Sequence, residues 1–189
     1  MSDYVITTDS NSDVRPEFIA ENNLTIIPQY YAFGDTVYGD ELNMEPHEFY
    51  ETMRNGELPK SMANNPAVIR ERFEKILKDG KDILHIAFSS ALSGSCNNVV
   101  MTANELLEEY PDRKIMVFDS LNASLGEGVS VYRGVDLWKE GKSMQEVFDI
   151  LTKEREHVNV SFTVNDLYHL QRGGPVSKTT AVVGSLVKI

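Results

Sequence analysis

Cysteine is almost absent from this sequence. Of its 189 residues only Cys96 is a cysteine, which excludes a disulfide framework and any CxxC zinc or redox site. The histidines stand at positions 47, 85, 157 and 169, and none falls in the HxxxH or HExxH spacing of a metal-binding helix. We therefore expect no metal site and no cofactor.

Long hydrophobic runs are also absent. No apolar stretch reaches the ~18 residues of a membrane-spanning helix, and residues 1–4 (MSDY) lack the basic and apolar regions of a signal peptide. Hydrophobic residues still make up 41% of the chain, too many for a disordered protein. We expect a cytoplasmic protein with its own core and no stable membrane insertion.

Positive charge is scarce. Lys and Arg number 18 against 29 Asp and Glu, which gives a net charge of −11. An acidic surface repels phosphate backbones and anionic lipid headgroups. We therefore expect no nucleic-acid partner.

Strand and helix patterns alternate regularly from residue 4 to residue 156. Apolar runs rich in β-branched residues predict strands at 4–8, 24–33, 82–88 and 114–118. Apolar residues at helical spacing predict helices at 16–21, 45–53, 95–110, 126–138 and 143–156, with a further helix beginning at 66. This alternation is typical of an α/β fold with an open, mainly parallel sheet and helices on both faces, an α/β/α three-layer arrangement.

The segment from residue 24 to residue 65 is less regular. Pro28 cannot donate a ladder hydrogen bond, so the strand around it is expected at a sheet edge or with a bulge. Gly-Asp pairs at 34–35 and 39–40 predict a hairpin-like excursion, and 61–65 (SMANN) reads as a polar loop. One set of apolar residues could either pack in the core or line an apolar pocket, and both interpretations stay open. The set is Met44, Phe49, Tyr50, Met53 and Met62.

The pattern changes after residue 157. Residues 158–164 predict a strand and residues 166–170 a short helix, and we expect the chain to stop inside an element. We expect residues 1–157 to form a first α/β domain with most of the ligand site. Residues 158–189 are expected to begin a second, smaller α/β domain whose remainder is absent from this chain.

Hydroxyl and acidic side chains gather where the predicted strands end, at 9–13, 89–95 and 119–126. In open α/β sheets ligands bind beyond the carboxyl ends of the strands. Ser93 and Gly94 stand just before a helix, whose free N–H groups suit a carboxylate or phosphate. The alternative is that these serines only cap helices.

Known catalytic motifs are missing from these loops. No GxSxG elbow is present, and the run from Gly126 carries Val131 where a dinucleotide fingerprint requires Gly or Ala. His85 lies inside a buried strand and is expected to be a core residue rather than a base. Cys96 is expected to be a packed thiol, although a helix N-terminus could lower its pKa.

A series of motifs resembles the DegV family, in the order and spacing of that family and along the whole chain. They are TDSNSD at 8–13, the segment 34–40, Phe49-Tyr50-x-x-Met53, Pro59-Lys60-Ser61, SSALSGS at 89–95, Asp119-Ser120 with Ser124 and Gly126, and 167–177 with Arg172-Gly173-Gly174.

The resemblance implies a bacterial fatty-acid-binding protein of two α/β domains that is not itself an enzyme. It implies a long-chain fatty acid such as palmitate or stearate, presented to a separate fatty acid kinase subunit. By motif position, the hydroxyls of Ser61 and Ser93 hold the carboxylate. Gly94 and Arg172 support the head group or contact the partner.

The sequence also departs from the family pattern. Ser61 is followed by MANN at 62–65 rather than by Ser-Gln-Pro-Ser, and relatives continue well past Ile189. Two further hypotheses therefore stay open. One is a hydrolase or transferase that uses the serine-rich loops on a small phosphorylated or carboxylated metabolite. The other is a domain fragment without a ligand of its own.

Overall fold

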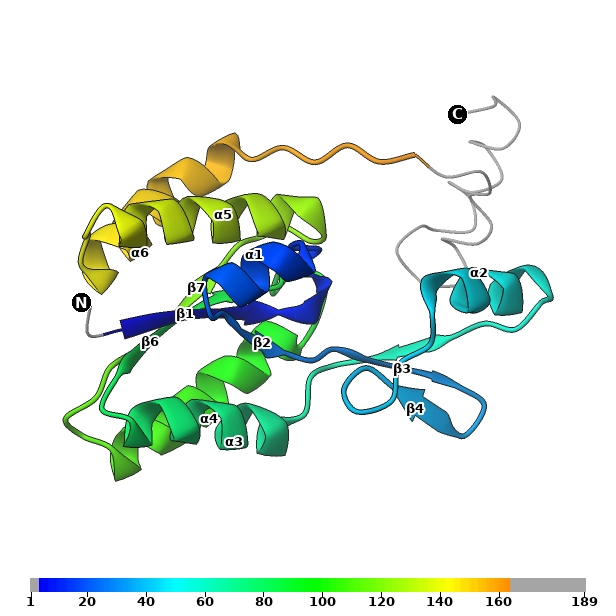
Figure 1. The fold of residues 1–189 in the computed structure, drawn as a ribbon, viewed down its shortest axis with the longest axis horizontal. Helices are drawn as coiled ribbons and strands as arrows, with labels where there is room; N and C mark the ends of the chain where they lie inside the picture. Colours follow the sequence, from blue (N-terminus) through cyan, green and yellow to red (C-terminus); the bar gives the residue numbers. More distant parts are fainter. Residues whose placement is uncertain (1–3, 164–189) are drawn as a thin grey trace. The chain divides into compact units, whose positions relative to one another are not determined.

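A computed structural model describes residues 4–163 of the chain (Figure 1). Its centre is a parallel sheet in the order β2-β1-β6-β7. Backbone register pairs Tyr4 with Asp82 and Ile83 with Ile115. The strands are β1 Tyr4–Asp9, β2 Thr25–Ile27, β6 Asp82–Ala87 and β7 Ile115–Asp119. The predicted open parallel sheet is confirmed.

Helices cover both faces of this sheet (Figure 1). Successive residues of β6 serve opposite cores, because Ile83 packs with α3 and α4 while Leu84 packs with α5 and α6. The α/β/α layering is therefore as predicted. The helices are α1 Pro16–Glu21, α3 Pro66–Lys78, α4 Ser95–Glu109, α5 Leu125–Lys139 and α6 Met144–Glu154.

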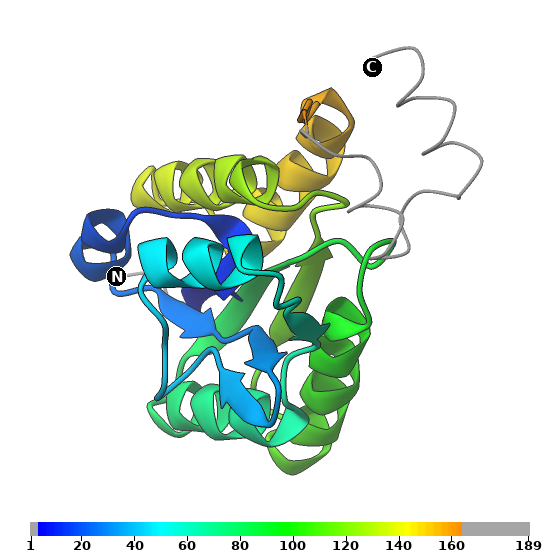
Figure 2. The same ribbon diagram turned by 90° about the vertical axis from the view of Figure 1, so that its right-hand side faces the viewer.

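A small antiparallel sheet with strand order β4-β3-β5 forms an arm beside the main sheet (Figure 2). Its strands are β3 Tyr30–Phe33, β4 Thr36–Tyr38 and β5 Lys60–Met62, and α2 spans Pro46–Arg54. The predicted hairpin is the β3–β4 pair. The ring centroid of Phe49 on α2 lies 5.1 Å from that of Tyr31 and 5.5 Å from that of Phe33. These aromatic contacts pack α2 against the arm.

The prediction of one strand over residues 24–33 was wrong. The structure has two strands there, β2 in the main sheet and β3 in the arm. Pro28 lies between them and has no N–H to continue a ladder. The predicted loop at 61–65 begins as the last two residues of β5.

The chain divides into two compact units, Met1–Asn159 and Val160–Ile189. A short helical turn, Arg155–His157, follows α6, and residues 158–163 form neither strand nor helix, so the strand predicted there was wrong over those residues. The helix predicted at 166–170 lies outside the described residues. The assignment of 158–189 to a second domain stays a prediction. Of the helices within residues 4–163, none could span a bilayer.

Helix α5 approaches the loop after β1 so closely that one glycine is required. A Cβ on Gly128 would lie 2.5 Å from the backbone oxygen of Ser12, in the turn Ser10–Ser12 that follows β1. A Cβ on Gly134, two turns further along α5, would meet Ile86 Cδ1 at 3.0 Å. Ile86 Cδ1 is the end of a flexible side chain and can move aside, whereas the Ser12 oxygen belongs to the backbone.

We predict that Gly128→Ala lowers the free energy of unfolding by about 1–3 kcal/mol, because a backbone carbonyl must move to admit the methyl group. Gly134→Ala is the matched control, since both substitutions gain the same helix propensity. Urea denaturation should find Gly134→Ala within about 1 kcal/mol of the wild type. Equal losses for the two variants would contradict the close-approach argument.

Candidate functional site

The loops that follow β1, β6 and β7 are joined at the carboxyl edge of the main sheet. The backbone N–H of Ser89 donates to Asn122 O at 3.0 Å, and Ser90 Oγ donates to Asp119 Oδ2 at 2.5 Å. Ser124 Oγ donates to Asp13 Oδ2, which links the third loop to the first. The sequence prediction that these polar loops gather at one edge is confirmed.

Backbone strain concentrates in the same loops. Asp13, Leu121 and Ser124 have φ values of 53°, 52° and 54°, in the left-handed region that residues other than glycine rarely adopt. Strained backbone of this kind is typical of binding sites, where the surrounding structure holds it in place.

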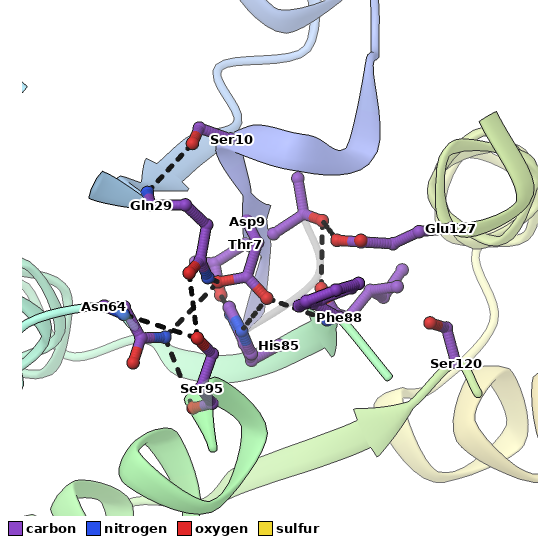
Figure 3. Close-up of polar contacts among 12 residues, drawn as sticks. Thr7, Asp9, Ser10, Gln29, Asn64, His85, Phe88, Ser95, Ser120 and Glu127 are labelled. Carbon is purple, nitrogen blue, oxygen red and sulfur yellow. Dashed lines mark hydrogen bonds and ion pairs between the residues drawn. The ribbon is translucent and has the colours of Figure 1, made fainter. Parts of the chain in front are cut away.

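Asp9, the last residue of β1, is a fully buried carboxylate at the centre of this edge. Its Oδ2 accepts a hydrogen bond from the Phe88 N–H at 2.8 Å, and its Oδ1 accepts one from Gln29 Nε2 at 3.0 Å (Figure 3). Burial acts to raise the pKa of Asp9, but the His85 imidazole and these two donors outweigh it and lower that pKa. Asp9 is therefore ionised at neutral pH.

His85 is a core residue, as predicted. It is fully buried on β6, where its Nδ1 lies 2.9 Å from Thr7 Oγ1 and its Nε2 lies 3.7 Å from Asp9 Oδ2. Cys96 is buried as well, and burial raises the pKa of its thiol to about 11. The thiol therefore stays protonated, as expected for a packed cysteine.

The turn before α4 carries Ser93, one of the two predicted carboxylate ligands. Ser93 is half-buried, and its Oγ accepts a hydrogen bond from the Ser95 N–H at 3.2 Å and lies 3.0 Å from Ser95 Oγ. Ser95 is fully buried and donates its hydroxyl proton to Gln29 Oε1 at 2.8 Å (Figure 3). Gly94 is the N-cap residue of α4 and is exposed.

Ser61, the other predicted ligand, is exposed on β5 in the arm. It lines a cavity of about 590 Å³ whose wall includes Tyr31, Met44, Phe49 and Tyr50. Met44, Phe49 and Tyr50 therefore line the pocket, and Phe49 belongs to the aromatic packing of the arm as well. No Lys or Arg is part of the cavity wall within the described residues.

Arg172, the remaining predicted site residue, lies outside the described residues. The described part of the strand-end site carries acidic side chains at Asp9, Asp13 and Asp119, and the Arg155 guanidinium donates to the Asp119 carbonyl oxygen at 2.9 Å. Within residues 4–163 no group of three or more His, Cys, Asp or Glu side chains could hold a metal ion.

Glu127 is a buried acid that sequence reasoning missed. It lies in the first turn of α5, where Thr8 Oγ1 is 3.1 Å from Glu127 Oε1 and 2.9 Å from the Ile86 carbonyl oxygen. Burial, and then the charge of Asp9, raises the pKa of Glu127 to about 9. Thr8 has one proton and can donate it to Ile86 while a protonated Glu127 donates to Thr8. Both hydrogen bonds therefore form when Glu127 is neutral.

The raised pKa of Glu127 predicts a pH-dependent stability. Its folded-state pKa of about 9 exceeds the ordinary value of 4.5, so its contribution is fully present below pH 4.5 and is lost as the pH rises toward 9. Glu127→Gln should therefore gain stability relative to the wild type with rising pH, by up to about 1.4 kcal/mol per pH unit between about 5 and 8.

Urea denaturation at pH 5 and pH 8 measures this difference. Glu17→Gln is the matched control, because Glu17 is an exposed glutamate in the first turn of α1. A difference between Glu127→Gln and the wild type that stays constant with pH would show that Glu127 is ionised in the fold.

The sequence places Asp9 and Ser95 in polar strand-end loops but assigns neither of them a role. Gln29 and Asn64 are polar residues from separate segments and carried no sequence signal for this site. Glu127 was noted only as a misfit in a dinucleotide motif. Glu127 lies between Gly126 and Gly128 and close to Val129 at the start of a predicted helix, and this apolar context was the one available hint that it is buried.

Comparisons with known proteins agree along the whole chain. A family model described as "Uncharacterised protein, DegV family" matches residues 3–189. A DegV domain-containing protein of Clostridium perfringens is 37% identical over an alignment of 191 residues that covers 100% of this chain and 66% of that protein. One of Staphylococcus aureus is 32% identical with the same coverage.

Solved structures show the same fold. A fatty-acid-binding DegV family protein from Thermus thermophilus superimposes with a TM-score of 0.82 at 27% identity, over 97% of this chain and 64% of that chain. A stearic-acid-binding protein from Eubacterium ventriosum gives a TM-score of 0.83 at 26% identity, over 96% of this chain and 63% of that chain. This chain thus spans slightly less than two thirds of these relatives. Since the family model matches nearly every residue and the fold agrees, the chain belongs to the DegV family.

Proposed function

We propose that this chain binds a long-chain fatty acid such as palmitate or stearate, with its carboxylate on the hydroxyls of Ser61 and Ser93. The observation that carries the proposal is the shared fold with two fatty-acid-binding relatives, at 26–27% identity and TM-scores of 0.82 and 0.83. The polar strand-end loops of this chain supply hydroxyl donors at the edge where α/β sheets bind ligands.

The head group is held by neutral donors. On a chain of net charge −11 no basic field attracts an anion. The N-terminus of the 15-residue helix α4 contributes partial positive charge next to Ser93 and Gly94. Hydrogen bonds from hydroxyls to a charged carboxylate are stronger than bonds between neutral groups. Arg172, by its place in the family motif, supports the head group or contacts the partner.

The apolar part of the ligand supplies most of the affinity. Each buried CH₂ contributes about 0.8 kcal/mol, so a modest head-group site suffices for a long acyl chain. The cavity beside Ser61, with Tyr31, Met44, Phe49 and Tyr50 in its wall, offers apolar surface. Its volume of about 590 Å³ falls within the roughly 300–1,000 Å³ of small-molecule sites.

The same proposal gives the chain a carrier role rather than an enzymatic one. Ser93 hydrogen-bonds to Ser95, and the His85 imidazole is buried against Thr7 and Asp9, so His85 does not act as a base toward Ser93. The carrier presents the carboxylate to a separate fatty acid kinase. Acyl phosphate should form when kinase, ATP, palmitate and this chain are combined, and equal formation without the chain would contradict this role.

The head-group assignment predicts that Ser61→Ala combined with Ser93→Ala weakens palmitate binding at least about tenfold, because two hydrogen bonds to a charged group are lost. Isothermal titration calorimetry with palmitate measures the change. Ser143→Ala is the control, since Ser143 caps α6 and lines a cavity with the first residue of β6. Unchanged palmitate affinity in the double variant would show that the carboxylate lies elsewhere.

A further inference from the structure

We propose that Asn64 is a positioning residue that sets the spacing between the Ser61 and Ser93 hydroxyls, so that both reach one carboxylate. This inference rests on the proposed function, in which two hydroxyls hold one carboxylate. It names the residue that positions these two hydroxyls relative to each other. Asn64 is 2% exposed and follows β5, three residues after Ser61.

The two hydroxyls belong to different parts of the fold. Ser61 lies on the antiparallel arm, whereas Ser93 lies in the turn before α4, beyond the main sheet. The strand pairs of the described residues join β5 only to β3. Backbone pairing therefore does not fix the distance between Ser61 and Ser93, and side-chain contacts must do so.

Asn64 supplies these contacts to the start of α4. Its backbone N–H donates to Ser95 Oγ at 3.3 Å, and its Nδ2 donates to the Ser95 carbonyl oxygen at 3.3 Å (Figure 3). Its own carbonyl oxygen accepts a hydrogen bond from Asn98 Nδ2 at 3.1 Å. Asn64 thus holds the first turn of α4 through side-chain and backbone groups at once.

The Asp9 carboxylate fixes the orientation of the Asn64 amide. Asn64 Nδ2 lies 3.5 Å from Asp9 Oδ1, and both this oxygen and the Ser95 carbonyl can only accept hydrogen bonds. The NH₂ end must therefore face them. We call the hydrogen bonds of Asn64 to Asp9, Ser95 and Asn98 the clamp. Since Asp9 is buried and also accepts from the Phe88 N–H just after β6, the clamp is anchored to the main sheet.

The neighbouring Asn65 provides a matched comparison. Asn65 is exposed, and its side chain caps α3 by accepting from the Ala67 N–H at 2.9 Å. Serine is an equally good cap residue, so Asn65→Ser preserves that role. Serine at position 64 is too short to keep the amide contacts with Asp9 and the Ser95 carbonyl oxygen. The same substitution therefore removes the side-chain contacts of the clamp at position 64 and leaves the helix cap at position 65 intact.

We expect Asn64→Ser to weaken palmitate binding about three- to tenfold, the effect of one or two hydrogen bonds, and Asn65→Ser to leave it unchanged. Methyl palmitate has the same acyl chain but no carboxylate, so its affinity should be equal in both variants. In the Ser61→Ala background, Asn64→Ser should cause no further loss, because spacing is irrelevant once one hydroxyl is gone.

Isothermal titration calorimetry of the full chain with palmitate and with methyl palmitate measures these affinities. Three outcomes would each overturn the clamp. Asn64→Ser could bind palmitate with wild-type affinity, it could lose equal affinity for palmitate and methyl palmitate, or its loss of palmitate affinity could add fully to that of Ser61→Ala. If Asn64→Ser does not fold, Asn98→Ala removes the contact from the α4 side and should weaken palmitate about twofold; an unchanged affinity there would also overturn it. Failure of the wild type to bind palmitate would overturn the proposed function itself.

Discussion

The hydrogen bonds to the buried carboxylate of Asp9 are the constraint on which the strand-end site depends. A buried charge is costly unless donors surround it, and here the donors come from three separate segments: Phe88 after β6, Gln29 before β3 and Asn64 after β5. Satisfying one anion thus brings the arm, the end of β6 and, through Ser95, the start of α4 to one place (Figure 3).

The proposed function requires an acidic chain to accommodate an anionic head group, and the same constraint bears on how it could do so. Asp9 is saturated by its own donors, and Glu127 is neutral because burial and the Asp9 charge raise its pKa to about 9. Only part of the formal negative charge at this edge is therefore effective. On the proposed function, the hydroxyls of Ser61 and Ser93 and the start of α4 can then serve as donors.

Local patterns predicted most of the fold, because strand and helix periodicity is a property of neighbouring residues. The apolar run of β6 and the proline that opens α3 are examples. Contacts between distant segments could not be predicted in this way. Asn64 meets Asp9 across 55 residues and Ser95 across 31, and its sequence neighbours read as a plain polar loop. Pro28 indicated an interruption, but not that β2 and β3 join different sheets.

The central claim is that one carboxylate bridges two hydroxyls whose spacing this network sets. A crystal structure of the chain with palmitate tests it most directly. The account predicts carboxylate oxygens within about 2.5–3.0 Å of both Ser61 Oγ and Ser93 Oγ, with the contacts of Asn64 to Ser95 and Asp9 retained. A palmitate whose carboxylate contacts neither hydroxyl, or an arm that binds it with those Asn64 contacts broken, would contradict the account.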